Sequence, residues 1–172
     1  MYLSLPFQNS QSRRITPLPS IMRIEDQIKQ AAFSSEWRKL RANLLHTSSW
    51  LRGELAQFLK PFGITQQQFN ILRVLRGQHP QALSTQQLRE RLIGRMSDTS
   101  RLVDRLQQKG LVCKEECSKD KRLVDVTITE KGLNLLYQID DKMPILDEVM
   151  QSLSLKEAEI LNKLLERLRR NS

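Results

Sequence analysis

The sequence predicts a mainly α-helical protein that carries one small β-hairpin. Along most of the chain the apolar residues recur every three or four positions, which is the period of an amphipathic helix. One stretch departs from this period, because Val124, Val126 and Ile128 alternate with polar residues in the manner of a half-buried strand. Just before that strand, at the predicted tip of the hairpin, stand four consecutive charged residues: Lys119, Asp120, Lys121 and Arg122.

Composition and charge favour a polyanionic partner. The chain of 172 residues has a net charge of +9, and residues 65–128 contribute +5, from twelve basic and seven acidic residues. A basic surface that is merely solvated is the alternative. No apolar run approaches the roughly 18 residues of a membrane span, and the N-terminus lacks a signal-peptide pattern. We therefore expect a cytoplasmic protein without a membrane partner.

The N-terminal part predicts an extension followed by a long helix. Residues 1–24 contain three prolines and no periodicity, and are expected to be disordered. From Ser35 a helix is expected to run to Pro61 and Gly63. Its apolar stripe consists of Trp37, Leu40, Leu44, Leu51, Leu55, Phe58 and Phe62. A helix of about 25 residues is longer than a small core needs. Two interpretations therefore stay open: a long core helix, or a helix at an interface between two subunits.

Three shorter helices are expected next. Thr65 with Gln68, and Ser84 with Gln87, have the spacing of capping boxes that begin helices ending near Gly77 and Gly94. A third helix is expected from Ser97 to Gly110. Its inward face would be Thr99, Leu102, Val103 and Leu106, and its outward face Asp98, Arg101, Asp104, Arg105 and Gln108. The last two helices fit a helix-turn-helix, although two helices of an ordinary bundle would give the same pattern.

The hairpin favours the helix-turn-helix. Strands are expected at 111–116 and 123–129, directly after the third helix, and this order is that of a winged helix. The helix from Ser97 would then lie in the major groove of DNA, and Arg122 or Lys121 would reach the adjacent minor groove. Asp120 is interpreted as a brace for Arg122 or Arg101.

The C-terminal third predicts two more helices. Thr129 caps the first, and Ser154 with Glu157 caps the second, whose apolar stripe is Ala158, Leu161, Leu164, Leu165 and Leu168. These helices and the first long one would hold two subunits together. We thus expect a dimerisation region formed by 25–64 and 129–172, and a DNA-binding domain formed by 65–128.

Taken together, residues 30–170 resemble the MarR family of bacterial transcription regulators. The resemblance is carried by LKPFGITQQQFNILRVL at 59–75, SDTSRLVDRLQQKGLV at 97–112 and DKRLVDVTITEKG at 120–132. It implies a homodimer on a pseudo-palindromic operator of double-stranded DNA, commonly acting as a repressor in the bacterial nucleoid. It also implies release by a small, often aromatic ligand bound between the dimerisation and DNA-binding regions.

By motif position, the resemblance implies two sets of DNA contacts. In the recognition helix they are Ser97, Asp98, Ser100, Arg101 and Arg105, and in the wing they are Lys119, Asp120, Lys121 and Arg122. Asp98 departs from a simple basic surface, because its carboxylate would repel a phosphate. It could accept a hydrogen bond from cytosine N4 or act as a second helix cap.

Nothing in the sequence favours an enzyme. His46 and His79 are the only histidines, and neither stands at a nucleophile or metal-ligand spacing. There is no phosphate-binding glycine loop and no evident pair of catalytic carboxylates. No cofactor and no metal site is predicted.

Two further interpretations concern a ligand and a thiol. Trp37, His46, Trp50 and Phe69 could line a ligand cleft, with core packing as the other reading of the aromatic residues. Cys113 and Cys117 lie about 13 Å apart in an extended strand, too far for a disulfide. A single reactive thiol in a redox-responsive regulator remains an alternative, as does a winged-helix module for protein–protein assembly or non-specific DNA binding.

Overall fold

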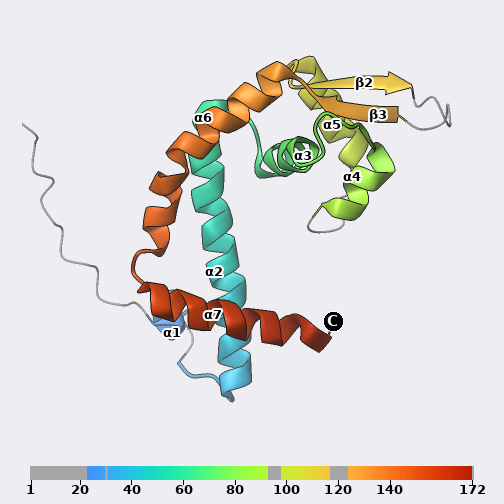
Figure 1. The fold of residues 1–172 in the computed structure, drawn as a ribbon. Coiled ribbons are helices and arrows are strands. Elements are labelled where there is room, and N and C mark those ends of the chain that lie inside the picture. The colour runs from blue at the N-terminus through green and yellow to red at the C-terminus, as the bar shows by residue number, and fades with distance from the viewer. Residues whose placement is uncertain (1–22, 30, 93–97, 117–123, 172) are drawn as a thin grey trace, which may run out of the picture. The chain divides into compact units, whose positions relative to one another are not determined.

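The computed structural model describes residues 23–29, 31–92, 98–116 and 124–171 (Figure 1). The chain forms two compact units, Met1–Ser48 and Ser49–Ser172. No helix in the described part of the chain is long and apolar enough to cross a membrane.

The first unit contains the short helix α1 (Ile24–Gln27) and the beginning of α2 (Glu36–Leu59). Ile24 is helical and only 5% exposed, although the expected disordered extension includes it. Glu25 is also buried, and it pairs with Lys39 of α2 at 2.8 Å and with Arg23 at 3.3 Å. A charge network therefore ties α1 to the start of the long helix.

Helix α2 ends close to the expected position. A 3₁₀ turn over Lys60–Phe62 follows it, with Pro61 in its first turn, and Gly63 adopts the left-handed conformation at φ 67°. Pro61 lacks the amide hydrogen that a longer α-helix would need, and glycine adopts positive φ without steric cost. These two residues end the helix as predicted.

Three helices of the second unit lie in the region predicted to bind DNA: α3 (Gln66–Arg76), α4 (Thr85–Arg91) and α5 (Thr99–Gln108). The capping boxes at Thr65 and Ser84 are both confirmed, with the hydroxyl accepting from the amide three residues on and the glutamine accepting in return. Ser97 and Gly94 lie outside the described residues, so the turn between α4 and α5 does too.

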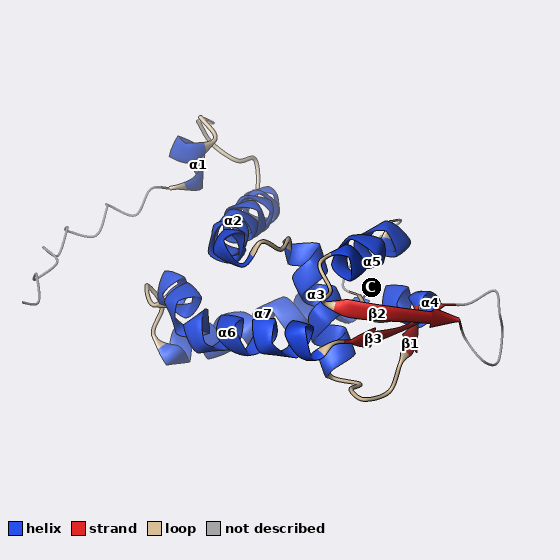
Figure 2. Ribbon diagram, turned by 90° about the horizontal axis from the view of Figure 1, so that it is seen from above, coloured by secondary structure: helices blue, strands red, loops and turns tan. Residues whose placement is uncertain are grey.

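A three-stranded antiparallel sheet completes this fold (Figure 2). Strands β2 (Val112–Glu116) and β3 (Val124–Ile128) form the predicted hairpin, with Val112 opposite Ile128 and Lys114 opposite Val126. The sequence did not predict β1 (Leu83–Ser84), which pairs with the other edge of β3. Two residues are too short to show a period-two pattern, so local sequence could not reveal this strand.

The core of the second unit lies where these helices meet the sheet. Every residue of the expected inward face of α5 is buried, from Thr99 to Leu106. Val126 and Ile128 of the sheet join the same core, together with Phe69 and Leu72 of α3. The recognition helix is thus anchored along one whole side.

Two helices follow the wing: α6 (Glu130–Asp147), continued by a 3₁₀ turn over Glu148–Met150, and α7 (Leu155–Leu168), continued by another over Arg169–Asn171. The caps at Thr129 and Ser154 are confirmed. Helix α6 contributes Leu133, Leu136 and Ile139 to the core, whereas α7 has no buried residue. The fold is mainly helical with a small sheet, as predicted.

Candidate nucleic-acid interface

The outward face of α5 carries the residues expected to meet DNA. Ser100, Arg101 and Arg105 are exposed, on the side of the helix opposite Leu102, Val103 and Leu106. In the described part of the chain, neither guanidinium forms an ion pair with a carboxylate. Both arginines are therefore available to base edges or phosphates.

Asp98 occupies the N-cap position of α5, but its side chain makes no capping hydrogen bond. The interpretation of Asp98 as a second cap is therefore wrong in this structure. The side chain is exposed, which leaves its carboxylate free to accept a hydrogen bond from a base. The neighbouring Ser97 lies outside the described residues.

The structure describes the two strands of the wing. Their antiparallel pairing is continuous from Val112 opposite Ile128 to Glu116 opposite Val124. The tip itself, with Lys119, Asp120, Lys121 and Arg122, lies outside the described residues, as does the proposed brace by Asp120. Cys113 is exposed on β2, and Cys117 also lies outside the described residues.

An ion pair that the sequence did not predict joins the recognition helix to the wing. Asp104 Oδ1 lies 2.6 Å from Lys114 Nζ of β2. Helical periodicity shows only that Asp104 is on the outward face, and strand periodicity shows only that Lys114 shares a face with Val112. The partnership between them arises from the fold.

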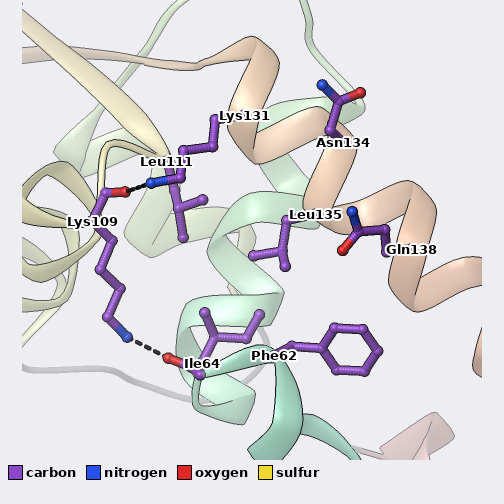
Figure 3. Close-up of a pocket in the computed structure, with 9 residues that line it drawn as sticks. Phe62, Ile64, Lys109, Leu111, Lys131, Asn134, Leu135 and Gln138 are labelled. Carbon is purple, nitrogen blue, oxygen red and sulfur yellow. Dashed lines mark hydrogen bonds between the residues drawn. The ribbon is translucent and has the colours of Figure 1, made fainter.

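The turn between α5 and β2 is held by hydrogen bonds with two other segments. Lys109 Nζ donates to the carbonyl of Gly63 and, at 3.3 Å, to Oε1 of Gln68. Lys131 Nζ donates to the carbonyl of Lys109 at 2.8 Å. Figure 3 shows both lysines spanning the gap between these segments. The C-terminal end of the recognition helix is thus attached to the start of α3 and of α6.

The first turn of α6 packs tightly against this connection. The Thr129 hydroxyl donates to the carbonyl of Gly110 at 2.8 Å, and its backbone N–H donates to that of Leu111. A Cβ at Gly132 would lie 2.3 Å from the carbonyl oxygen of Leu111 and 2.7 Å from Cγ1 of Ile128. Only glycine allows such a close approach.

A cavity of about 620 Å³ lies beside this connection. Figure 3 shows the side chains that surround it. It is lined by Phe62, Gly63, Ile64, Lys109, Leu111, Lys131, Asn134, Leu135 and Gln138. Apolar walls with two ammonium groups and two side-chain amides suit a small amphipathic molecule.

Of the four residues predicted to line a ligand cleft, one is buried and three are exposed. Phe69 is 3% exposed and belongs to the core, where Arg73 lies over its ring at 5.6 Å. Trp50 is exposed in the second unit, and Trp37 and His46 are exposed in the first. Neither Phe69 nor Trp50 lines the cavity described above. For Phe69 the structure supports the alternative, core packing, because burial leaves its ring no access to a ligand.

Comparison with known proteins identifies the family. A family model described as the MarR family matches residues 62–123. The HTH-type transcriptional regulator MhqR of Bacillus subtilis (strain 168) is 31% identical over 111 residues, which are 64% of this chain and 75% of the relative. The chain belongs to the MarR family.

Solved structures of MarR proteins share the architecture. A mutant MarR from E. coli, complexed with operator DNA, is 27% identical and covers 74% of this chain and 91% of its own, with a TM-score of 0.67. The organohalide-sensing regulator RdhR-CbdbA1625 in its 2,4-dichlorophenol-bound form shares the fold at 22% identity, with a TM-score of 0.73 over 80% of this chain and 82% of its own. The protein is therefore a DNA-binding MarR transcription regulator with a winged-helix fold, and its relatives are regulators rather than enzymes.

Proposed function

We propose that this MarR protein is a homodimeric repressor that binds a pseudo-palindromic operator and leaves it when a small ligand binds. The observation that carries the proposal is the anchored recognition helix, with Arg101 and Arg105 exposed one turn apart. An arginine on a rigid helix can donate two hydrogen bonds to O6 and N7 of a guanine in the major groove. Asp98, with Ser97 and Ser100, would add polar contacts at the start of the same helix.

The wing would supply contacts outside the major groove. The paired strands end at Glu116 and resume at Val124, and residues 117–123 connect them in the sequence. Within them Lys119, Lys121 and Arg122 would contact phosphates or the minor groove, where negative potential is concentrated. Asp120 would orient one of these cations.

Exposed apolar side chains on α7 support the homodimer. Leu161, Leu164 and Leu168 are 44%, 46% and 53% exposed, and α7 has no buried residue. A helix with an apolar stripe is stable in water when that stripe is covered. A two-fold partner would cover it and place two recognition helices about 34 Å apart, in successive major grooves.

The cavity beside Lys109 and Lys131 is the proposed ligand site. A ligand with a phenolate or carboxylate would compete with the carbonyls of Gly63 and Lys109 for these ammonium groups. The C-terminal end of α5 would then lose two of its attachments. 2,4-Dichlorophenol is the ligand in the RdhR-CbdbA1625 structure. It is therefore a suitable first probe for release of DNA by this protein, which we propose acts in the bacterial cytoplasm.

Two arginine variants test the DNA-binding proposal. Arg101→Ala should relax the preference at one base pair by about 1–3 kcal/mol, because a bidentate contact reads a base. Arg122→Ala should weaken binding to every duplex alike and reduce the slope of log K against log salt by about one, because its proposed contact, with phosphates or the minor groove, depends on charge more than on base sequence. Competition binding at several salt concentrations measures both. Two variants without effect would favour a protein–protein assembly module instead.

A further inference from the structure

We infer that the ion pair between Asp104 and Lys114 is a positioning device, which fixes the angle between the recognition helix and the wing and thereby sets operator specificity. This inference rests on the proposed function, because it assumes that α5 reads bases while the wing holds the backbone. Neither residue belongs to the predicted DNA contacts. Both act through the elements that carry those contacts.

The surroundings of Lys114 explain how it reaches the helix. It lies opposite Val126 in the sheet and two residues from Val112, both of which are buried. Its stem thus follows the core side of the hairpin, while its ammonium group extends to Oδ1 of Asp104 at 2.6 Å. The side chains of Lys114 and Asp104 are 26% and 49% exposed, so the pair lies at the edge of the core.

Asp104 had another basic residue at pairing distance on its own helix. It follows Arg101 by three residues, a spacing at which helical side chains commonly pair. The ion pair that it forms is nevertheless with Lys114 of the wing. The Lys114 ammonium group thus balances the charge of the Asp104 carboxylate, and Arg101 remains available for DNA.

The pair adds a further tie between two elements that a turn and a shared core already connect. Backbone hydrogen bonds hold the turn, from Gly110 N–H to the Gln107 carbonyl at 2.8 Å and from Leu111 N–H to the Leu106 carbonyl at 3.0 Å. Asp104 lies before these residues on α5, and Lys114 lies beyond them on β2. Core packing and the turn already hold α5 against the sheet, and the ion pair adds a cross-link at the edge of that core, which limits small changes in the angle. Base readout is sensitive to such angles, because a misplacement of about 1 Å is costly.

A purely electrostatic role for Asp104 makes a different prediction. An unbraced acid near DNA repels phosphates, so its removal would strengthen binding to every duplex equally. A positioning role predicts that its removal weakens binding to the operator while binding to other duplexes stays the same or strengthens. The ratio of the two affinities therefore separates the roles.

The experiment uses the full chain and a duplex that the wild-type protein selects from a random library. Dissociation constants are measured for that duplex and a scrambled one with wild type, Asp104→Ala, Lys114→Met and the double variant Asp104→Lys/Lys114→Asp. Glu115→Gln is the control, because it removes an exposed acid from the same strand without breaking an ion pair found in the described structure. The double variant keeps the net charge of the wild type.

We expect each single variant to reduce the operator-to-scrambled ratio by about fivefold, which is within the range of coupling between contacting residues. The double variant should recover part of that loss, and Glu115→Gln should leave the ratio unchanged. Single variants with the wild-type ratio would overturn the positioning role, and so would a double variant whose ratio is reduced by the product of the two single reductions. If the wild type selects no sequence, the proposed function itself fails, and the inference fails with it.

Discussion

At the scale of single residues, several charged side chains do more than solvate a surface. Lys109 and Lys131 donate to carbonyls of other segments, and Asp104 pairs with a strand. Helical spacing alone would place each of them on a polar face exposed to water. Long side chains can bridge elements while their charge stays near solvent. Residue type and local period therefore identify candidates for such bridges without identifying their partners.

Glu25 provides a prediction about pH. A hydrogen bond from the Lys39 ammonium group, then one from backbone N–H and one from Arg23, lowers the pKa of Glu25 from 4.5 to about 2. Because the folded pKa lies below the unfolded one, the stabilisation is fully present above about 4.5 and is lost as the pH falls through about 2. Attachment of α1 to α2 should weaken in that range.

A carbon-13 NMR titration of the Glu25 carboxyl measures this pKa. In Lys39→Met we expect the midpoint to rise toward 4.5, because the hydrogen bond from Lys39 is the largest cause of the lowered pKa. Lys29→Met is the matched control, since Lys29 is exposed in the same unit and has no ion pair with Glu25 in the described structure. A midpoint that stays low in Lys39→Met would show that this ion pair does not hold the carboxylate.

At the scale of elements, the connection between α5 and α6 depends on one glycine. Gly132→Ala should destabilise the protein by about 1–3 kcal/mol, because the new methyl group would overlap the Leu111 carbonyl and the Ile128 side chain. Gly53→Ala is the comparison. Gly53 lies inside α2 with no atom within 4 Å of an added Cβ, so alanine should stabilise by about 0.5–1 kcal/mol through helix propensity.

Urea denaturation of the two variants measures both changes. The expected result is a midpoint shift of opposite sign for Gly132→Ala and Gly53→Ala. A rise in the midpoint for both would mean that helix propensity alone governs the two positions and that the first turn of α6 can move away from the hairpin without cost.

The elements themselves were largely predictable, because their signals are local. The capping boxes at Thr65, Ser84 and Ser154 and the inward face of α5 depend on residues three or four positions apart, and the structure confirms them. The ion pair of Asp104 depends on a partner ten residues away in a different element. Strand β1 and the cavity likewise require the whole fold, so no local pattern could have revealed them.

At the scale of the whole molecule, α7 is the part least explained by a single chain. Without a partner, the stripe of leucine side chains on this helix would stay exposed to water, which is unfavourable and uncommon for a patch of this kind. Leu164→Glu should therefore convert a dimer to a monomer, since a carboxylate in an apolar interface would lose its hydration. Asn162→Glu adds the same charge at an exposed polar position of this helix and should remain dimeric. Light scattering during size-exclusion chromatography measures the mass, and an unchanged Leu164→Glu dimer would locate the interface elsewhere.

The central claim is that this MarR protein reads a specific DNA sequence. The most direct measurement is fluorescence anisotropy of the full chain with the duplex it selects from a random library, against a scrambled duplex of equal length and composition, at near-physiological salt. We predict affinity for the first at least about a thousandfold higher than for the second, as for specific regulators. Equal affinity for both would contradict the claim and leave a winged-helix protein whose basic surface binds DNA without reading it.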